Sequence, residues 1–391
     1  MKKTGFILAA ILAAALTGCG TEQTGQAQTE AATETAETES GQVQEEKETK
    51  EKGPALTVDK DAKTITVKAE ATGNTDSSIH LLVNQDGSNA EHAFFTTEAT
   101  SMDFYNALVE LGAVPGNNIP VDAADGTILG SGMDVSVSAE GQDYGVYDMI
   151  EASEKREMDM RFGGNIALNQ EYGTGCLLCL ESCSVGVASD AAYEYNEKIE
   201  FVPSEQMPEK GTEAVFTLAV DDTAMVVDKE NSRISMNAVS TGYAESTIHA
   251  VVNEDGANAD KTLFTTKALT GDFYRALKEL GAEDGNNIAL DDADGTIEGT
   301  SLDVAAEIGT KTGSFAELFT DSGDREMDIR FGGNLEVNQE YATGCIMCLE
   351  SCPAGITSNA AYQYKEEAVF GPSRQMPEAG KHIIVTFTVK K

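Results

Sequence analysis

Several features that mark large protein classes are missing or scarce in this sequence. It has no tryptophan, four histidines and seven cysteines in 391 residues, and only 27 basic residues against 66 acidic ones. The net charge of −39 would repel a polyphosphate backbone, so we expect no nucleic-acid partner. The apolar stretch at residues 6–16 is too short to cross a bilayer, which takes about 20 apolar residues. With 41% hydrophobic and 24% charged residues, the composition indicates a soluble globular protein.

Common catalytic signatures are also missing. The sequence has no Walker loop, no GxSxG elbow and no Ser/His/Asp set with informative spacing. Carboxylates are so numerous that no pair of them stands out as a catalytic acid and base. The sequence therefore favours a binding or carrier protein over an enzyme.

The N-terminus has the pattern of an export signal. Lys2 and Lys3 precede the apolar stretch, which leads into Leu16-Thr17-Gly18-Cys19. This ending resembles the bacterial lipobox, which implies a signal peptide over 1–18, cleavage before Cys19 and attachment of diacylglycerol to its sulfur. We therefore expect an extracytoplasmic protein that a lipid anchor holds to the bacterial cell membrane. The twin-arginine pair is missing, so the chain would be exported unfolded by the general route.

Residues 19–53 form the next predicted segment. Beyond Cys19 it has no aromatic residue and one large aliphatic residue, Val43. Such a composition buries too little apolar surface to offset the entropy of ordering the chain. We expect a disordered linker that holds the folded part away from the membrane.

The rest of the chain repeats itself with an offset of 169 residues and no gap. His80 aligns with His249, and Cys176 aligns with Cys345. A period of this size is that of a whole domain, which predicts two tandem homologous domains over 54–220 and 221–391.

Each unit shows more strand patterns than helix patterns. In the first unit, β-branched and aromatic residues predict strands over 64–70, 78–83, 92–99, 133–138, 157–162 and 214–220. One amphipathic helix follows the third strand, with Phe104, Leu108 and Leu111 on its buried side. Ser101 is the expected N-cap and Gly112 the left-handed stop. Because the connections are short, we predict an α+β fold with a mainly antiparallel sheet and a cysteine-bearing helix or loop.

The two copies have diverged unevenly. Residues 157–183 and 326–352 are identical at 20 of 27 positions, whereas 137–156 and 306–325 match at only 2 of 20. Both stretches have had the same time to drift, so the first is under the stronger constraint. This constrained block contains the cysteines.

Three cysteines in each unit have the spacing CxxCxxxC. They are Cys176, Cys179 and Cys183 in the first unit, and Cys345, Cys348 and Cys352 in the second. On a helix these positions would fall within an arc of about 60°. A loop could bring the three sulfurs together as well. Three converging thiolates suit zinc, cuprous copper or an iron-sulfur cluster.

The spacing also equals the last three cysteines of the bacterial ferredoxin run CxxCxxCxxxCP. A fourth ligand would then come from elsewhere, and His80 and His249 are candidates because they match across the copies. Both lie in apolar strand patterns, where a histidine of the core is the alternative. A disulfide with a third free thiol and a buried inert set of cysteines are further alternatives.

The chain resembles a known family over nearly all of residues 57–389. The resemblance lies in "IHLLVNQDGSNAEHAFFTTEATSMDFYNALVELGAVPGNNI", in "RFGGN" and in "TGCxxCLESCPxGIxSNAxY". These motifs are similar to those of the YdjY-like domain of bacterial exported proteins. The resemblance implies a cysteine-motif domain that binds a metal or an iron-sulfur cluster.

A glycine-containing loop precedes the cysteines in both units by eleven residues. Its candidate residues are Arg161, Gly163, Gly164 and Asn165, with Arg330, Gly332, Gly333 and Asn334 in the second copy. Adjacent glycines let a backbone approach closely and direct N–H groups at an anion or at cluster sulfurs. A tight turn is the alternative interpretation.

Together these patterns favour a lipid-tethered protein with two three-cysteine sites that hold metal or pass electrons to a redox partner protein. One alternative is a thiol-disulfide oxidoreductase, which needs a thiolate of low pKa. Another is a surface binding module whose cysteines join loops.

Overall fold

The computed structural model describes residues 53–292 and 294–391, which belong to one compact unit. The predicted signal peptide, Cys19 and all but the last residue of the predicted linker lie outside the described residues. Among the described residues, no helix has the length and apolar character that a membrane span requires.

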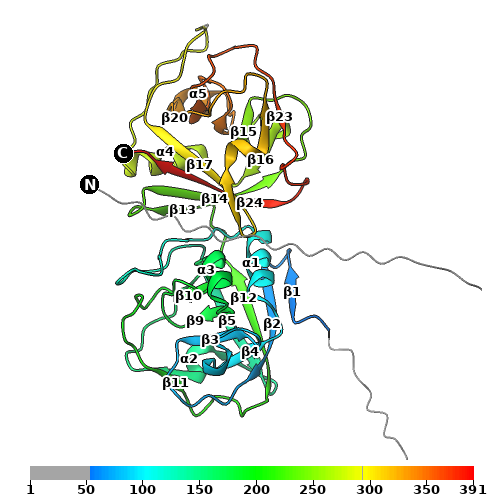
Figure 1. Cartoon of the computed structure of the whole chain (residues 1–391), viewed down its shortest axis with the longest axis vertical. Coiled ribbons are helices and arrows are strands. Elements are labelled where there is room, and N and C mark those ends of the chain that lie inside the picture. Colours follow the sequence, from blue (N-terminus) through cyan, green and yellow to red (C-terminus); the bar gives the residue numbers. More distant parts are fainter. Residues whose placement is uncertain (1–52, 293) are drawn as a thin grey trace, which may run out of the picture. The chain divides into compact units, whose positions relative to one another are not determined.

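The first repeat contains twelve strands and four short or medium helices (Figure 1). The strands are β1 (Leu56–Asp59), β2 (Thr64–Ala71), β3 (His80–Asn84), β4 (Phe95–Thr97), β5 (Met133–Ala139), β6 (Gln142–Gly145), β7 (Ile150–Ala152), β8 (Met160–Arg161), β9 (Cys176–Cys179), β10 (Ala188–Asp190), β11 (Phe201–Pro203) and β12 (Glu213–Val220). The helices are the 3₁₀ turn η1 (Ala90–His92), α1 (Ser101–Glu110), α2 (Val146–Met149) and α3 (Ile166–Tyr172).

The second repeat has the same order of elements, with a 3₁₀ turn in the place of α2. Its strands are β13 (Met225–Asp228), β14 (Arg233–Ser240), β15 (His249–Asn253), β16 (Thr262–Thr266), β17 (Ser301–Ile308), β18 (Lys311–Ser314), β19 (Phe319–Asp321), β20 (Ile329–Phe331), β21 (Cys345–Cys348), β22 (Thr357–Asn359), β23 (Phe370–Pro372) and β24 (His382–Val389). Its helices are η2 (Ala259–Lys261), α4 (Thr270–Glu279), η3 (Phe315–Leu318) and α5 (Leu335–Glu340).

The main sheet of each repeat runs in a closed circuit of strand pairs. In the second repeat the circuit is β14-β16-β15-β21-β22-β20-β17-β24 and back to β14. The first repeat has the equivalent order, and the isolated bridge between Gly132, directly before β5, and Arg161 of β8 closes its circuit. Only the pairs β3/β4 and β9/β10 and their equivalents are parallel among the described strands. The predicted α+β fold with a mainly antiparallel sheet is therefore confirmed.

The amphipathic helix forms where the sequence predicts it, but its cap is one residue earlier. The side chain of Thr100 accepts a hydrogen bond from the backbone N–H of Asp103, so Thr100 is the N-cap and Ser101 the first helical residue. The expected buried face is correct, because Phe104 and Leu108 are fully buried. In the second copy Leu269 takes the cap position without a side-chain hydrogen bond.

Each repeat has a large apolar core and a separate small cluster around its cysteines. Leu82 of β3 and Leu178 of β9 lie opposite each other and belong to the large core. Val83 and the cysteines belong instead to the small cluster. Since alternate strand residues face opposite sides of a sheet, the cysteines lie on the side of β3 and β9 away from the main core.

Candidate metal centres

The first two cysteines of each unit lie on a strand. Cys176 and Cys179 are the two ends of β9, and Cys183 follows in the next loop. The predicted helical arrangement of the triplet is therefore wrong, and the loop alternative holds for the third cysteine. The segment extends because β9 pairs with β3 on one side and with β10 on the other, so neighbouring strands take its backbone hydrogen bonds.

Two irregularities explain how cysteines three residues apart share one side of a strand. In a regular strand, residues i and i+3 face opposite sides of the sheet. Here the pairing of β3 with β9 skips Leu81 on one strand and Leu177 on the other. Because Leu177 is skipped, Cys176 and Cys179 are separated by two paired positions instead of three. Because Leu81 is skipped, the same holds for His80 and Val83 on the other strand. As a result Cys176 and Cys179 face the same side, and His80 lies opposite Cys179.

A histidine joins these two thiols. The Nδ1 atom of His80 lies 3.5 Å from the sulfur of Cys176. The ligand atoms of His80, Cys176 and Cys179 all lie within 4.8 Å of one another, so this group could hold a metal ion. His80 was predicted as a candidate fourth ligand, with a core histidine as the alternative. The structure places it beside the sulfurs.

The third cysteine lies next to this group. Cys183 and Cys179 are hydrogen-bonded to each other, but Cys183 is not one of the three residues whose ligand atoms lie mutually within 4.8 Å. All three cysteines are buried, with side chains at most 3% exposed. The arrangement is thus a histidine and two thiols with the third thiol beside them, whereas the sequence predicts three thiols with the histidine as a candidate fourth ligand.

Hydrogen bonds shift the pKa values of two of the thiols in opposite directions. Cys179 hydrogen-bonds to Cys176 and, together with His80 and Asn89, holds the pKa of Cys176 well below its ordinary value although burial opposes this. The same contact, a further one to Cys183 and burial raise the pKa of Cys179 well above its ordinary value. Of these two thiols, Cys176 therefore has the lowered pKa and Cys179 the raised one.

Sequence reasoning missed an amide that donates to the sulfur. Asn89 lies in the turn before η1, and its Nδ2 donates to the sulfur of Cys176 at 3.2 Å. In the second copy Asn258 donates to Cys345 at 3.3 Å. The identity of these asparagines at matching positions was the available signal.

A second asparagine in each unit fixes the backbone of the cysteine segment. Asn169 is 1% exposed, and its Nδ2 donates to the carbonyl oxygens of Cys176 at 3.0 Å and Val185 at 2.8 Å. Asn165, from the predicted glycine loop, donates to the carbonyl oxygen of Cys183 at 3.1 Å. Asparagines of the 157–183 block therefore hold both ends of the cysteine motif, which gives a physical reason for its constraint.

The backbone N–H groups of the glycine loop point to protein oxygens. Gly163 donates to the carbonyl of Arg161, Gly164 donates to that of Val187, and Asn165 donates to Oδ1 of Asn117. The tight-turn interpretation therefore describes the loop, and its support of the site comes from the Asn165 side chain. Gly164 has a φ of +85°, and a Cβ there would lie 2.5 Å from the Asn117 side chain. The second-copy residues Arg330, Gly332, Gly333 and Asn334 repeat these contacts.

A glycine backbone lies close to one sulfur in each site. A Cβ on Gly186 would lie 2.8 Å from the sulfur of Cys179, and one on Gly355 would lie 3.0 Å from that of Cys348. A side chain at either glycine position would therefore displace the sulfur.

The second copy repeats the first contact by contact. His249 Nδ1 lies 3.4 Å from the sulfur of Cys345, and these two residues form the second possible metal group with Cys348. Cys352 hydrogen-bonds to Cys348, as Cys183 does to Cys179. Hydrogen bonding to Cys348 is likewise the largest cause of the lowered pKa of Cys345.

Comparisons with known proteins agree with the duplication. The model of the YdjY domain matches residues 56–219 and again residues 225–388. A curated relative, the uncharacterized protein YdjY of Escherichia coli (strain K12), is 41% identical over 143 residues, which are 35% of this chain and 64% of the relative. The match thus spans less than two thirds of that relative, and no solved structure matches. The chain belongs to the YdjY domain family and carries its domain twice in tandem.

Proposed function

We propose that the protein is an extracytoplasmic, lipid-anchored metal-binding protein that holds one metal ion in each repeat. The observation that carries the proposal is the close approach of one imidazole nitrogen and two sulfurs, all within 4.8 Å of one another in both copies. Ligands that share one ion at bond lengths of about 2.0–2.3 Å must come this close together.

The tight spacing favours a single ion over a cubane cluster. In an iron-sulfur cluster of this type the cysteines bind different irons, so their sulfurs are separated by the inorganic core. The predicted iron-sulfur cluster is thus the less favoured cofactor.

Zinc is the first candidate for the ion. Three cysteines and one histidine make a common tetrahedral zinc site, and the third thiol of each repeat lies beside the second. The His/Cys/Cys group alone, as two thiolates and a neutral imidazole around a divalent ion, carries no net charge, which suits the apolar neighbours Val83 and Ala93, whereas a third thiolate would add one negative charge. Zinc has no redox chemistry, so electron transfer follows only if the site prefers copper or iron.

A bound ion would also explain how free thiols persist in a protein outside the cytoplasm. All six described cysteines are free and buried. Oxidising compartments favour disulfides, and two hydrogen-bonded thiols are an easy target for oxidation. Metal coordination would hold them as thiolates.

The test of the metal is direct chemical analysis. Residues 20–391 are purified without oxygen, and metal, acid-labile sulfide and visible absorption are measured. We expect about two metal ions per chain, no labile sulfide and no iron-sulfur colour. Iron with equimolar sulfide would overturn the single-ion proposal, and metal-free protein would overturn metal binding altogether.

The lipid anchor has its own test. In cells that express the full precursor, the wild-type chain should incorporate labelled palmitate and fractionate with the membrane. The variant Cys19→Ala should do neither, while its folded part keeps its metal. Equal labelling of both chains would contradict lipidation at this residue.

A thiol-disulfide oxidoreductase is the second candidate. It is favoured by the low pKa of Cys176 beside Cys179, the asymmetry that thiol enzymes use. Burial counts against it, since both side chains are 0% exposed and a protein substrate could not reach them. Rapid reduction of a model disulfide by the metal-free chain would favour this candidate.

A further inference from the structure

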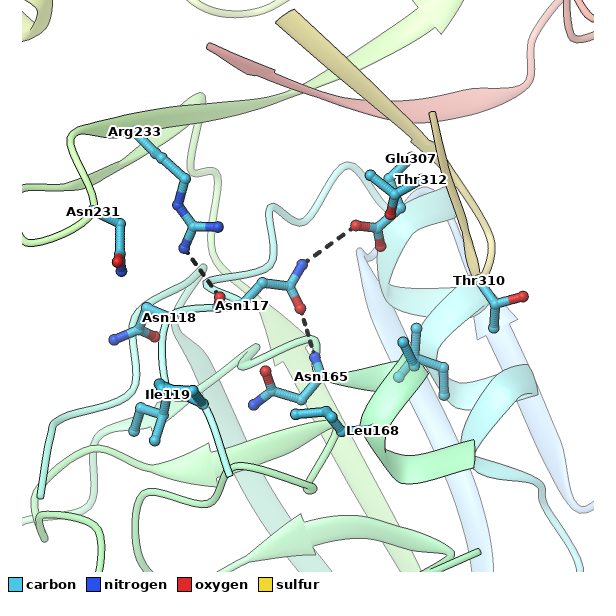
Figure 2. Close-up of a pocket in the computed structure, with 13 residues that line it drawn as sticks. Asn117, Asn118, Ile119, Asn165, Leu168, Asn231, Arg233, Glu307, Thr310 and Thr312 are labelled. Atoms are coloured by element: carbon cyan, nitrogen blue, oxygen red, sulfur yellow. Dashed lines mark hydrogen bonds between the residues drawn. The ribbon is translucent and has the colours of Figure 1, made fainter. Parts of the chain in front are cut away.

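A pocket with a mixed polar and apolar lining, outside the two His/Cys/Cys groups, lies among residues of both repeats (Figure 2). Its volume is about 410 Å³, within the range of pockets that hold small molecules. The wall from the first repeat contains Asn117 and Asn165, and the wall from the second contains Arg233, Glu307 and Thr312. The pocket thus combines one carboxylate and one guanidinium with amide and hydroxyl groups.

Glu307 supplies a carboxylate with unused capacity. One of its oxygens accepts a hydrogen bond from the hydroxyl of Tyr105. Its Oε2 has only the Nδ2 of Asn117 as a partner among the described residues, at 3.4 Å. Burial raises the pKa of the carboxyl group. A half-buried acid with one weakly bonded oxygen favours a cationic hydrogen-bond donor in the pocket.

Arg233 supplies a guanidinium that is ion-paired with Asp228 through its Nε and Nη2 atoms. Its Nη2 donates to Asp228 at 2.7 Å and to the carbonyl oxygen of Asn117 at 3.0 Å, which fixes the plane of the guanidinium (Figure 2). Its Nη1 makes no hydrogen bond with any residue of the described ranges 53–292 and 294–391. An oriented guanidinium with a free N–H group is suited to a carboxylate ligand.

Neither charge has an equivalent in the first repeat. Ser138 occupies the position of Glu307, and Thr64 occupies the position of Arg233. Glu307 also lies in the stretch where the copies match at only 2 of 20 positions. The two charges are therefore specific to the second copy, and the shared fold does not require them.

We propose that this pocket binds a small zwitterion, of the class of free amino acids, with its ammonium group on Glu307 and its carboxylate on Arg233. Asn117 lies between the two charged groups, since its Nδ2 donates to Glu307 and its backbone carbonyl oxygen accepts from Arg233 (Figure 2). The metal sites take no part in this binding.

The test is calorimetric titration of metal-replete residues 20–391 with glycine, β-alanine and 4-aminobutyrate. In these three ligands the ammonium and carboxylate groups are separated by increasing distances. Acetate and ethylamine each carry one charge and serve as reference ligands. We expect at least one zwitterion to bind about tenfold or more tightly than either reference ligand. No binding of any zwitterion at millimolar concentration, or equal binding of acetate, would overturn the proposal.

Matched variants assign the site. Glu307→Gln keeps an oxygen for the Tyr105 hydroxyl but loses the charge, so zwitterion affinity should fall about tenfold or more. Ser138→Gln, at the equivalent position of the first repeat, should leave affinity unchanged. Thermal unfolding and metal content show that both variants are folded. Equal affinity of the two variants would contradict the assignment.

Discussion

The two repeats have kept nearly the same residues in their cysteine regions but have diverged in their hairpins. In the cysteine regions the contact between His80 and Cys176, at 3.5 Å, has a counterpart at 3.4 Å between His249 and Cys345. The hairpins β5–β6 and β17–β18 share a backbone arrangement but almost no residues. Strand pairing alone is thus enough to maintain a hairpin, whereas the cysteine region depends on particular side chains.

One tyrosine shows what the divergence has changed. Tyr105 of the first repeat donates to Glu307 of the second, across the repeats. Its counterpart Tyr274 donates to Asp284 within its own repeat, at 2.6 Å. The hairpin that was free to drift acquired a contact with the other repeat, and the cysteine region kept its own contacts.

The largest expected effect comes from removing a ligand in one copy at a time. Cys176→Ser and Cys345→Ser should each lower the metal content from about two ions per chain to about one, with more than about 100-fold weaker binding at the altered site. Metal analysis and competition with a chelator measure both quantities. Loss of both ions from either single variant would break the comparison, because it would mean that the sites are not independent.

A smaller effect is expected from one added methyl group. Gly186→Ala places a Cβ within 2.8 Å of the Cys179 sulfur, so the sulfur must move and the site should bind metal more weakly. The expected loss of folding stability is about 1–3 kcal/mol. Gly141→Ala is the control, since its Cβ would meet no atom within 4 Å, although its positive φ adds some strain. Unchanged metal affinity in Gly186→Ala would show that the site tolerates a wider sulfur arrangement.

The asparagine that holds the cysteine backbone should matter in both copies to the same degree. Asn169→Ala leaves the carbonyl oxygens of Cys176 and Val185 without their side-chain donor, as Asn338→Ala does in the second copy. Each change should cost about 1–3 kcal/mol of stability and about 10–100-fold in metal affinity at its own site. Chemical denaturation and chelator competition measure the two losses. An effect in one copy only would mean that the equivalent contacts of Asn169 and Asn338 do not contribute equally to stability and metal binding.

The smallest effect is in the response to pH. The Tyr274 hydroxyl, with Lys278, lowers the pKa of Asp284 to about 2, whereas burial raises that of Glu307. The ionised Asp284 therefore stabilises the fold above the ordinary carboxyl range, and this contribution is lost as the pH falls through about 2. Carboxyl NMR titration should give two midpoints on opposite sides of the ordinary value. Tyr274→Phe should move the Asp284 midpoint upward, and equal midpoints for the two acids would contradict the contrast.

Much of the fold could be predicted from residue patterns, because alternating apolar residues and one amphipathic stripe determine strands and a helix locally. The duplication and the constrained block likewise depend only on comparing the copies. The closed order of strands could not be predicted, since it depends on pairings far apart in the sequence. The cap at Thr100 was missed because neighbouring hydroxyl residues offer the same chemistry.

The site was predicted in composition but not in geometry. The spacing CxxC suggested a helix, and the strand that replaces it brings the sulfurs together only because Leu81 and Leu177 are skipped in the pairing. No local sequence pattern predicts such a bulge. The role of His80 depended on the same pairing, which places it opposite Cys179.

The most direct test of the central claim is X-ray absorption of the metal in residues 20–391 as isolated without oxygen. The account predicts one nearest shell of sulfur at about 2.3 Å and nitrogen at about 2.0–2.1 Å, the same for both sites, with no second metal nearby. His80→Ala combined with His249→Ala should remove the nitrogen contribution. A metal–metal distance typical of a cluster, or a shell of oxygen ligands alone, would contradict it.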